Sequence, residues 1–228
     1  MRFTVADGQP LDITLTTVWV AGWTGRDPVA VAQHIAELAE LGVPAPSTVP
    51  LYYRIAANLL TQSQTIQVVG GQTSGEVEPI LIATDDTLWL GLASDHTDRG
   101  LETYSVALAK QACAKPLAAQ LWRFDEVADH IDQLQLQSWI RPSGEAEWTL
   151  YQSGSLAAIR PLAELMHGTP NATSEGQLPP GSALLCGTLA VISGGVRPAA
   201  AFRMTLHDPV CQRSLHHHYT VDSLPIVN

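Results

Sequence analysis

Carboxylate side chains stand two positions apart at Glu76 and Glu78 in this sequence of 228 residues. In a strand these two side chains share one face, while Val77 points to the other. Two carboxylates so close repel each other unless a proton or a cation lies between them, and Mg²⁺ prefers oxygen ligands of this kind. The pair therefore indicates a metal site, although a solvated strand face carries the same pattern.

A second polar group is the segment 94–99, SDHTDR, which contains Asp95 and Arg99. It follows an apolar run at 88–93 that is typical of a buried strand, and functional side chains commonly lie where such a strand ends. The alternative is a turn followed by a helix cap, with Asp98 as the cap and Arg99 paired with Asp95 or Glu102. From the residues alone this alternative is favoured.

A third candidate is the pair His34 and Glu37, three positions apart in an expected helix. Side chains at this spacing can touch. A Glu that is hydrogen-bonded to a His raises its basicity and fixes its tautomer, as a general base requires. An ordinary surface pair on an amphipathic helix is the other interpretation.

Strands dominate the elements that must position these groups. Asp27 followed by Pro28 predicts a helix start, and Gly42 predicts its end near residue 41. Further helices are expected at 101–110 and 124–131, and a last one is expected to be capped by Ser155 and to run to 166. Strands are expected at 13–19, 66–69, 76–83, 88–93, 134–140, 148–151, 183–192, 200–207 and 216–221. Because strands and helices do not alternate strictly, the pattern predicts an α+β fold with a mixed, largely antiparallel sheet.

Composition narrows the class of protein. The formal net charge of −10 and the lack of a basic run argue against a nucleic-acid partner. We see no signal peptide and no apolar stretch long enough to span a membrane. The three cysteines are widely spaced, which fits free thiols in a reducing cytoplasm. Residues 1–228 are expected to form one domain.

The histidines outside these motifs are expected to have structural roles. His130 and Asp132 are expected to cap a short helix, and His207-Asp208-Pro209 is expected to be a turn that ends a strand. The tract 216–218 contains three histidines, but alternate residues of a strand face opposite sides. The tract is therefore a poor site for one ion, although it can bind metal adventitiously.

Taken in order, these pieces resemble the fumarylacetoacetate hydrolase-like superfamily over residues 20–196. In that superfamily a strand ending in glycine precedes an H-x-x-E helix, which looks like Gly22 followed by His34 and Glu37. Its E-x-E metal motif is similar to residues 76–78, and its N-D-x-S-A-R-D block is similar to residues 94–99. Ser94 and Asp98 depart from that block, which has Asn and Ala there.

Later blocks extend the resemblance. The K-S-x-D block is replaced by residues 109–112, so Lys110 is expected to be the pocket lysine, with Lys115 as the alternative. The Q-x-G-x-T block is similar to residues 151–155, which include Gln152. The block L-x-P-G-D-x-I-x-T-G-T-P is similar to residues 178–188, which end at Thr188. The amino-acid sequences of segments 94–99 and 109–116 also resemble those of an uncharacterised bacterial branch of the superfamily.

The resemblance implies a mixed β-sandwich roll of mostly antiparallel strands with a few peripheral helices, assembled as a homodimer. It implies that Mg²⁺ or Mn²⁺ is bound by Glu76, Glu78 and Asp95. His34, Glu37 and Lys110 would be catalytic, and Arg99, Gln152 and Thr188 would bind a small-molecule carboxylate substrate. The implied chemistry is hydrolysis of a C–C bond, or decarboxylation, of a 2-oxo acid or β-dicarbonyl compound through a metal-stabilised enolate.

Other functions stay open at this point. The same scaffold carries isomerases and hydratases, and fold alone does not choose among these activities. A catalytically inactive, metal-stabilised binding or regulatory protein is a second class. A sugar-binding β-barrel with exposed Trp23, Trp122 or Trp148 is a third, although the six tryptophans are expected mainly in the core and at its rim.

Overall fold

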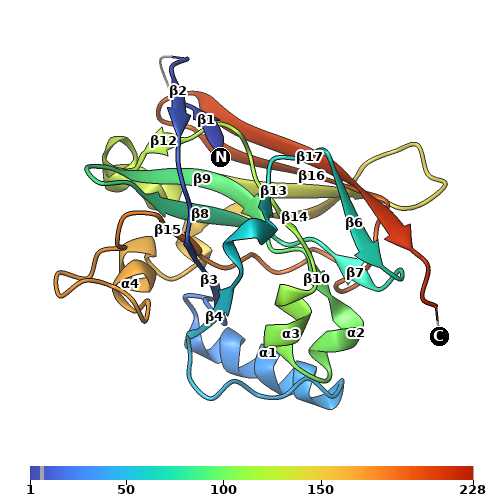
Figure 1. Ribbon diagram of the computed structural model, residues 1–228. Coiled ribbons are helices and arrows are strands. Elements are labelled where there is room, and N and C mark those ends of the chain that lie inside the picture. The colour runs from blue at the N-terminus through green and yellow to red at the C-terminus, as the bar shows by residue number, and fades with distance from the viewer. Residues whose placement is uncertain (6–7, 228) are drawn as a thin grey trace.

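The computed structural model describes residues 1–5 and 8–227, and its strands form two large sheets (Figure 1). The six-stranded sheet has the order β12-β9-β8-β15-β3-β4. Its strands are β12 (Trp122–Arg123), β9 (Leu88–Ser94), β8 (Val77–Ala83), β15 (Ser182–Leu185), β3 (Thr17–Gly22) and β4 (Leu51–Ile55). The five-stranded sheet has the order β14-β13-β16-β17-β6. Its strands are β14 (Thr149–Ser155), β13 (Gln135–Arg141), β16 (Ala201–Asp208), β17 (Arg213–Leu224) and β6 (Thr65–Val69).

Short strands pair at the margins of these sheets. β1 (Arg2–Thr4) pairs with β2 (Pro10–Asp12), β7 (Thr73–Ser74) with β10 (Thr97–Asp98), and β5 (Leu60–Thr61) with β11 (Lys115–Pro116). Pairing is parallel between β15 and β3, between β17 and β6, and between β11 and β5. The remaining strand pairs of the described residues are antiparallel. The predicted α+β fold with a mixed, mostly antiparallel sheet is therefore confirmed.

The alternation of β8 shows why both of its faces are buried. Leu81 packs in a core cluster with Leu136 and Met204 of the five-stranded sheet, so this cluster joins the two sheets. Ile80 and Ile82 point the other way, into a second cluster on the outer face of the six-stranded sheet. Because strand side chains alternate, Glu78 shares the outer face with Ile80 and Ile82.

The helices lie outside the sheets. They are α1 (Pro28–Glu40), α2 (Arg99–Glu102), α3 (Val106–Gln111) and α4 (Leu162–His167), with 3₁₀ turns η1 (Ala57–Leu59), η2 (Phe124–Glu126), η3 (Ala128–Gln133) and η4 (Leu156–Ala158). The side chain of Asp27 accepts a hydrogen bond from the Val29 N–H at 2.8 Å, which confirms the predicted start of α1. Gly42 follows the helix with φ +88°, a conformation that glycine adopts without strain.

Five predicted elements are wrong in detail. The strand expected at 13–19 is β3, which begins at Thr17, and the helix expected at 124–131 is the pair of 3₁₀ turns η2 and η3. The helix expected from Ser155 to 166 is interrupted, because a proline at 161 disfavours helical backbone at the residue before it. Ser155 makes no capping hydrogen bond. The helix expected at 101–110 is divided into α2 and α3, and Ser105 caps α3. The strand expected at 183–192 ends at Leu185, since Gly187 turns the chain with φ +92°.

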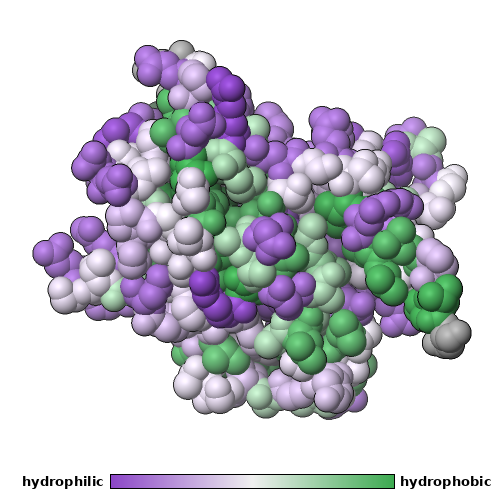
Figure 2. Space-filling model, in the orientation of Figure 1, coloured by the Kyte–Doolittle hydropathy of each residue, from purple (hydrophilic) through white to green (hydrophobic). Residues whose placement is uncertain are grey.

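Apolar side chains also reach the surface. Figure 2 shows them over the short helices and near the C-terminal end of the chain. They include Leu101, Tyr104 and Leu108 at the helices and Val69 and Ile226 near the C-terminus. Within the described residues, no helix has both the length and the apolar character that crossing a membrane requires.

Candidate metal centre

The three predicted metal ligands lie on one face of the β8–β9 ladder. Val77 pairs with Ser94, and the N–H of Asp95 donates to the carbonyl of Glu76 at 2.9 Å. Glu76 therefore lies opposite Asp95, and alternation places Glu78 on the same face. The antiparallel register thus brings together carboxylates from two separate sequence motifs. Their oxygens nevertheless do not all come within 4.8 Å of one another.

Asp95 is fully buried between two lysines. Lys110 Nζ contacts its Oδ2, and Lys115 Nζ lies 3.1 Å from its Oδ1. Burial favours the neutral acid, but the two ammonium charges outweigh burial and hold the pKa of Asp95 well below its usual range. Asp95 is therefore an ionised carboxylate.

The two lysines differ in their surroundings. Burial lowers the pKa of Lys110, but the carboxylates of Asp95, Glu76 and Glu78 outweigh burial and raise it, so this lysine is charged. Its ammonium also lies 5.5 Å from the centre of the Tyr53 ring. Lys115 donates to the carbonyl of His96 as well, and burial lowers its pKa. Both lysines contact Asp95, so Lys110 as the pocket lysine, with Lys115 as the alternative, stays a prediction.

Glu78 is a buried carboxylate that no basic side chain of the described residues pairs with as a salt bridge. Its exposed fraction is 2%, and its Oε2 accepts a hydrogen bond from the N–H of Gly187 at 2.8 Å. Burial and the charge of Asp95 raise the pKa of Glu78 well above its usual value. A carboxylate in this position takes up a proton or attracts a cation. The donor set, which consists of carboxylate oxygens alone, fits a hard divalent cation.

Glu76 is held at the edge of the group by Arg99. The guanidinium Nη2 lies 3.2 Å from Glu76 Oε2, Nη1 donates to Glu102 at 3.0 Å, and Nε donates to Ser74 at 2.7 Å. Burial opposes the charge of Arg99, but Glu76 and Glu102 outweigh it and raise its pKa. Asp98 accepts from the Leu101 N–H at 3.0 Å and caps α2. The cap and the pairing of Arg99 with Glu102 are thus confirmed, but the expected turn is wrong, because Thr97 and Asp98 form the short strand β10. Arg99 also contacts one predicted metal ligand.

Gln152 and Thr188 hold the start of β8 from the opposite side. Gln152 is fully buried, and its Nε2 donates to Thr188 Oγ1 at 2.7 Å and to the Leu189 carbonyl at 2.7 Å. Its Oε1 accepts from the Val77 N–H at 3.1 Å and from Ser138 Oγ at 2.9 Å. Every hydrogen-bonding position of the Gln152 amide is occupied within the protein. The substrate-binding roles of Gln152 and Thr188 stay predictions.

The structure does not bring His34 and Glu37 into the carboxylate group. Both side chains are more than half exposed on α1, and His34 Nδ1 lies 3.9 Å from Glu37 Oε2. The His34 ring is 6.0 Å from that of Trp23, whose indole N–H donates to the hydroxyl of Tyr53 at 3.3 Å. These contacts lead from His34 to Tyr53, whose ring centre lies 5.5 Å from the Lys110 ammonium. The catalytic roles of His34, Glu37 and Lys110 stay predictions.

A second polar network lies behind the carboxylates, and sequence reasoning missed it. His96 Nδ1 is 3.0 Å from the hydroxyl of Tyr219, and its Nε2 is 2.8 Å from Thr73 Oγ1. Burial lowers the pKa of His96 to about 3, and nearby Lys115 and Arg99 add to this, so the imidazole is neutral. His96 follows Asp95 directly and points to the opposite face. Nothing in the sequence signals a partner 123 residues away.

Comparisons with known proteins identify a family and similar folds. The family model described as protein of unknown function, DUF2848, matches residues 21–219. No curated protein matches the sequence. A fumarylacetoacetate hydrolase family protein from Yersinia pestis has a similar structure, with a TM-score of 0.61, 19% identity, and coverage of 97% of this chain and 100% of that chain.

Two further solved structures resemble the chain and hold metals. 2-keto-3-deoxy-D-arabinonate dehydratase complexed with magnesium and 2,5-dioxopentanoate gives a TM-score of 0.63 at 14% identity, covering 94% of this chain and 75% of that chain. 4-oxalocrotonate decarboxylase from Pseudomonas putida, complexed with calcium and acetate, gives 0.53 at 14% identity, covering 92% and 78%. The fold that the sequence resemblance predicted is confirmed.

Proposed function

We propose that the DUF2848 family, to which the chain belongs, is a branch of the fumarylacetoacetate hydrolase-like superfamily and that the chain is a divalent-metal-dependent enzyme acting on a small 2-oxo acid or β-dicarbonyl compound. The observation that carries the proposal is the buried carboxylate of Glu78, which faces the same side of the ladder as Glu76 and Asp95 and has no salt-bridge partner among the described residues. Burial of an unpaired carboxylate charge is unfavourable, and a bound cation would offset that cost.

Glu76, Glu78 and Asp95 are the residues that would hold Mg²⁺ or Mn²⁺. When bound, the cation would act as a Lewis acid on a substrate oxygen. The magnesium and calcium complexes of similar folds support a divalent metal in general. The choice between Mg²⁺ and Mn²⁺ is part of the proposal.

Charge balance points to an anionic substrate. The three carboxylates face three cationic side chains, which are Lys110, Lys115 and Arg99. Glu102 also pairs with Arg99, so four carboxylates face three cations and the fully ionised group has a net charge of −1. A divalent cation alone would therefore leave one uncompensated positive charge in a buried site. A substrate carboxylate offsets this charge, together with the negative charge that develops on the neighbouring oxygen. The metal and the acid are therefore expected to bind together.

The side chains have separate tasks in this proposal. Lys110 gives up its contact with Asp95 Oδ2, and its ammonium then neutralises the substrate carboxylate or a developing oxyanion. His34 activates water or removes a proton, and Glu37 orients it once the 3.9 Å between Nδ1 and Oε2 shortens to a hydrogen bond. Because both residues are exposed on α1, this role requires α1 to approach the carboxylates when substrate is bound. Arg99 and Thr188 lie beside Glu76 and Val77, where they can orient the substrate.

The preferred reactions are hydrolysis of a C–C bond and decarboxylation. A panel of acylpyruvates and oxaloacetate, assayed with Mg²⁺ or Mn²⁺, tests this proposal. Turnover is expected with metal, and it should be lost in EDTA and in Glu78→Gln. A matched control is Glu145→Gln, which changes an exposed loop residue and should keep full activity. Metal binding without turnover of any substrate would favour the inactive binding protein, and turnover only by isomerisation or hydration would favour those activities.

The sugar-binding alternative has less support. Trp122 is buried, and the Arg213 guanidinium lies 4.6 Å from its ring centre. The ring of Trp148 is covered by Arg141 and Arg203, at 5.1 Å and 4.3 Å. These rings are therefore not free platforms for a sugar. Carbohydrate binding that persists in EDTA would revive this alternative.

The homodimer and the cytoplasmic location are further parts of the proposal. Exposed apolar residues such as Leu108 and Ile226 give the chain surface that an interface can cover. Figure 2 shows apolar surface over the short helices and near the C-terminal end. Light scattering of the purified chain is expected to give twice the mass of 24.5 kDa. A mass of one chain at micromolar concentration would contradict the dimer.

A further inference from the structure

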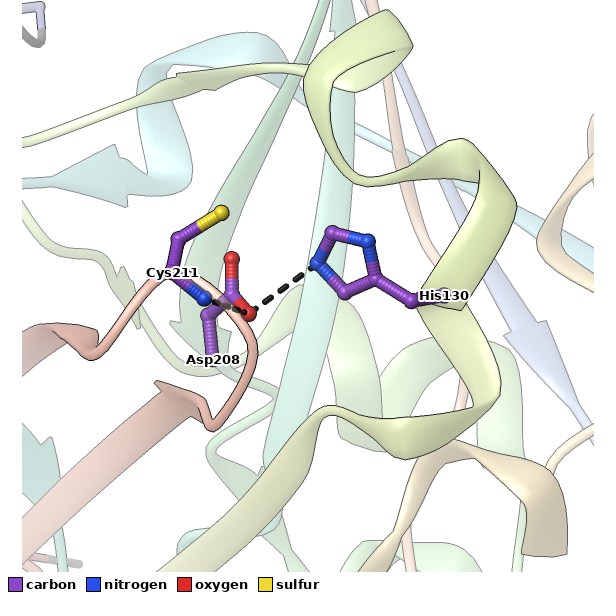
Figure 3. A group of neighbouring side chains, drawn as sticks. All are labelled: His130, Asp208 and Cys211. Carbon is purple, nitrogen blue, oxygen red and sulfur yellow. Dashed lines mark hydrogen bonds and ion pairs between the residues drawn. The ribbon is translucent and has the colours of Figure 1, made fainter.

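A second group of metal-ligating side chains lies where η3 meets the hairpin between β16 and β17 (Figure 3). His130 comes from η3, while Asp208 and Cys211 come from the hairpin. One ligand atom from each residue lies within 4.8 Å of the other two. The three donors are an imidazole nitrogen, a carboxylate oxygen and a thiol, a set that suits a borderline-soft cation better than Mg²⁺.

Asp208 is fixed before any ligand arrives. Its side chain is fully buried, and Oδ1 accepts hydrogen bonds from the N–H groups of Val210 and Cys211, both at 3.0 Å. His130 Nε2 lies 3.0 Å from the same oxygen. The turn that aims these N–H groups contains Gln212 at φ +52°, a conformation uncommon outside glycine. The carboxylate and the imidazole are therefore preorganised, which lowers the cost of ordering a site.

The other oxygen of Asp208 has fewer hydrogen-bond partners than Oδ1. Within the described residues, Oδ2 accepts one hydrogen bond, from Arg213 Nε at 3.3 Å. This is longer than the 2.7–2.9 Å or so that is typical of charge-assisted bonds, and the guanidinium is engaged more closely by Glu126 at 2.7 Å. Figure 3 shows the sulfur of Cys211 beside this oxygen. Cys211 is exposed, so a cation from solution can reach it.

We propose that His130, Asp208 and Cys211 form a second metal site, which binds Zn²⁺ and keeps its fourth position for water. The Cys211 thiol loses its proton to solvent as the Zn–S bond forms. His130 gives up the hydrogen bond from its Nε2–H to Asp208 Oδ1, that proton is exchanged through solvent to Nδ1, and the neutral imidazole then binds through Nε2. The two charges of Zn²⁺ are then balanced by the thiolate and the carboxylate, so the buried carboxylate gains a cation without excess charge.

This site is separate from the carboxylate site. Tyr219, which contacts His96, pairs with Phe202, while Asp208 pairs with Arg213 at the hairpin end of the same two strands. Six residues of extended chain separate Phe202 from Asp208, which corresponds to roughly 20 Å. A metal here would therefore tie η3 to the hairpin and would have no contact with the proposed substrate. Metal binding at this site can therefore be measured without an assay of catalysis.

Cobalt spectroscopy of the full chain, freed of metal, tests the proposal. Co²⁺ is expected to produce a thiolate-to-metal charge-transfer band in the near ultraviolet that saturates at one ion per chain, and Zn²⁺ should abolish the band. Cys211→Ser should lose the band, and because this side chain is exposed, the variant should fold. His130→Gln should weaken Zn²⁺ binding by at least about tenfold in competition with a chromophoric chelator.

Two control variants separate this site from other metal-binding groups. Glu78→Gln removes a ligand of the first site, and His216→Gln alters the histidine tract of β17; both should keep the band. Zn²⁺ added to a weakly buffered solution should release one proton per ion in the wild type and none at this site in Cys211→Ser. The absence of a thiolate band would overturn the assignment. A band that survives in Cys211→Ser, or Zn²⁺ binding that depends on His216 instead, would do the same.

Discussion

Replacing Glu78 by Gln should change how the stability of the metal-free protein depends on pH. Glu78 is buried, and burial together with the charge of Asp95 raises its folded-state pKa well above the ordinary value of 4.5. The folded protein therefore holds a proton on Glu78 at pH values where the unfolded chain has lost it. Stability falls as pH rises above about 4.5, because folding then requires protonation or burial of a charge.

The size of this effect follows from linkage. A group that is protonated in the folded state and ionised in the unfolded state lowers the free energy of unfolding by about 1.4 kcal/mol for each pH unit. Between pH 5 and pH 7 the loss is at most about 3 kcal/mol. Gln is close in shape to the protonated acid and can still accept the hydrogen bond from the N–H of Gly187. Glu78→Gln should therefore match the wild type near pH 4.5 and become progressively more stable than it at higher pH.

Urea unfolding in EDTA at pH 5, 6 and 7 measures this difference. The exposed Glu145, changed to Gln, is the control and should give a difference that does not depend on pH. Added Mg²⁺ with oxalate should reverse the order at pH 7, because the cation stabilises the wild-type carboxylate. A constant difference between Glu78→Gln and the wild type from pH 5 to 7 would refute the reasoning, since Glu78 would then titrate as it does in the unfolded chain.

Three further outcomes are expected. Gly75→Ala should cost about 1–3 kcal/mol in urea unfolding, because the added methyl overlaps the buried hydroxyl of Tyr219; an unchanged midpoint would contradict this packing. Lys110→Met should destabilise the metal-free protein by about 3 kcal/mol, and a divalent cation should raise its melting temperature more than that of the wild type, since the ammonium no longer occupies Asp95. Asp208→Asn in EDTA should lower the free energy of unfolding by about 2 kcal/mol at pH 7, and by progressively less as pH falls from about 4 to 2. The reason is that burial raises the pKa of Asp208 but its hydrogen-bond donors outweigh burial and lower the pKa to about 2. An equal loss of stability at pH 7 and pH 2 would exclude the charge as its cause.

The sequence predicts those parts of the fold that depend on local pattern. The strands of the β8–β9 hairpin follow from their apolar runs, and α1 follows from its cap and its glycine. Alternation also places Glu76 and Glu78 on one face. The errors arise where one residue overrides a longer pattern, as Pro161 does between η4 and α4 and as Gly187 does after β15.

The site was predictable to a lesser degree, because its key contacts are between distant segments. The pairing of Asp95 with Glu76 depends on strand register, and a register slip of one residue would have turned the carboxylates apart. Lys115 reaches Asp95 from β11, whose parallel pairing with β5 has no local sequence signal. The cap expected from His130 and Asp132 is wrong, because Asp132 pairs with Arg26 at 2.7 Å and η3 has no side-chain cap. His130 instead contacts Asp208 of a hairpin 78 residues away, a contact that no local pattern signals.

Mn²⁺ binding followed by electron paramagnetic resonance tests most directly whether the carboxylates of β8 and β9 hold a divalent cation. With oxalate present, the wild-type chain is expected to remove one Mn²⁺ from solution per carboxylate site. Glu78→Gln should lose that binding, while Cys211→Ser, which alters only the hairpin group, should keep it. Equal Mn²⁺ affinity in the wild type and in Glu78→Gln would contradict the assignment of the metal site and the enzyme proposal that depends on it.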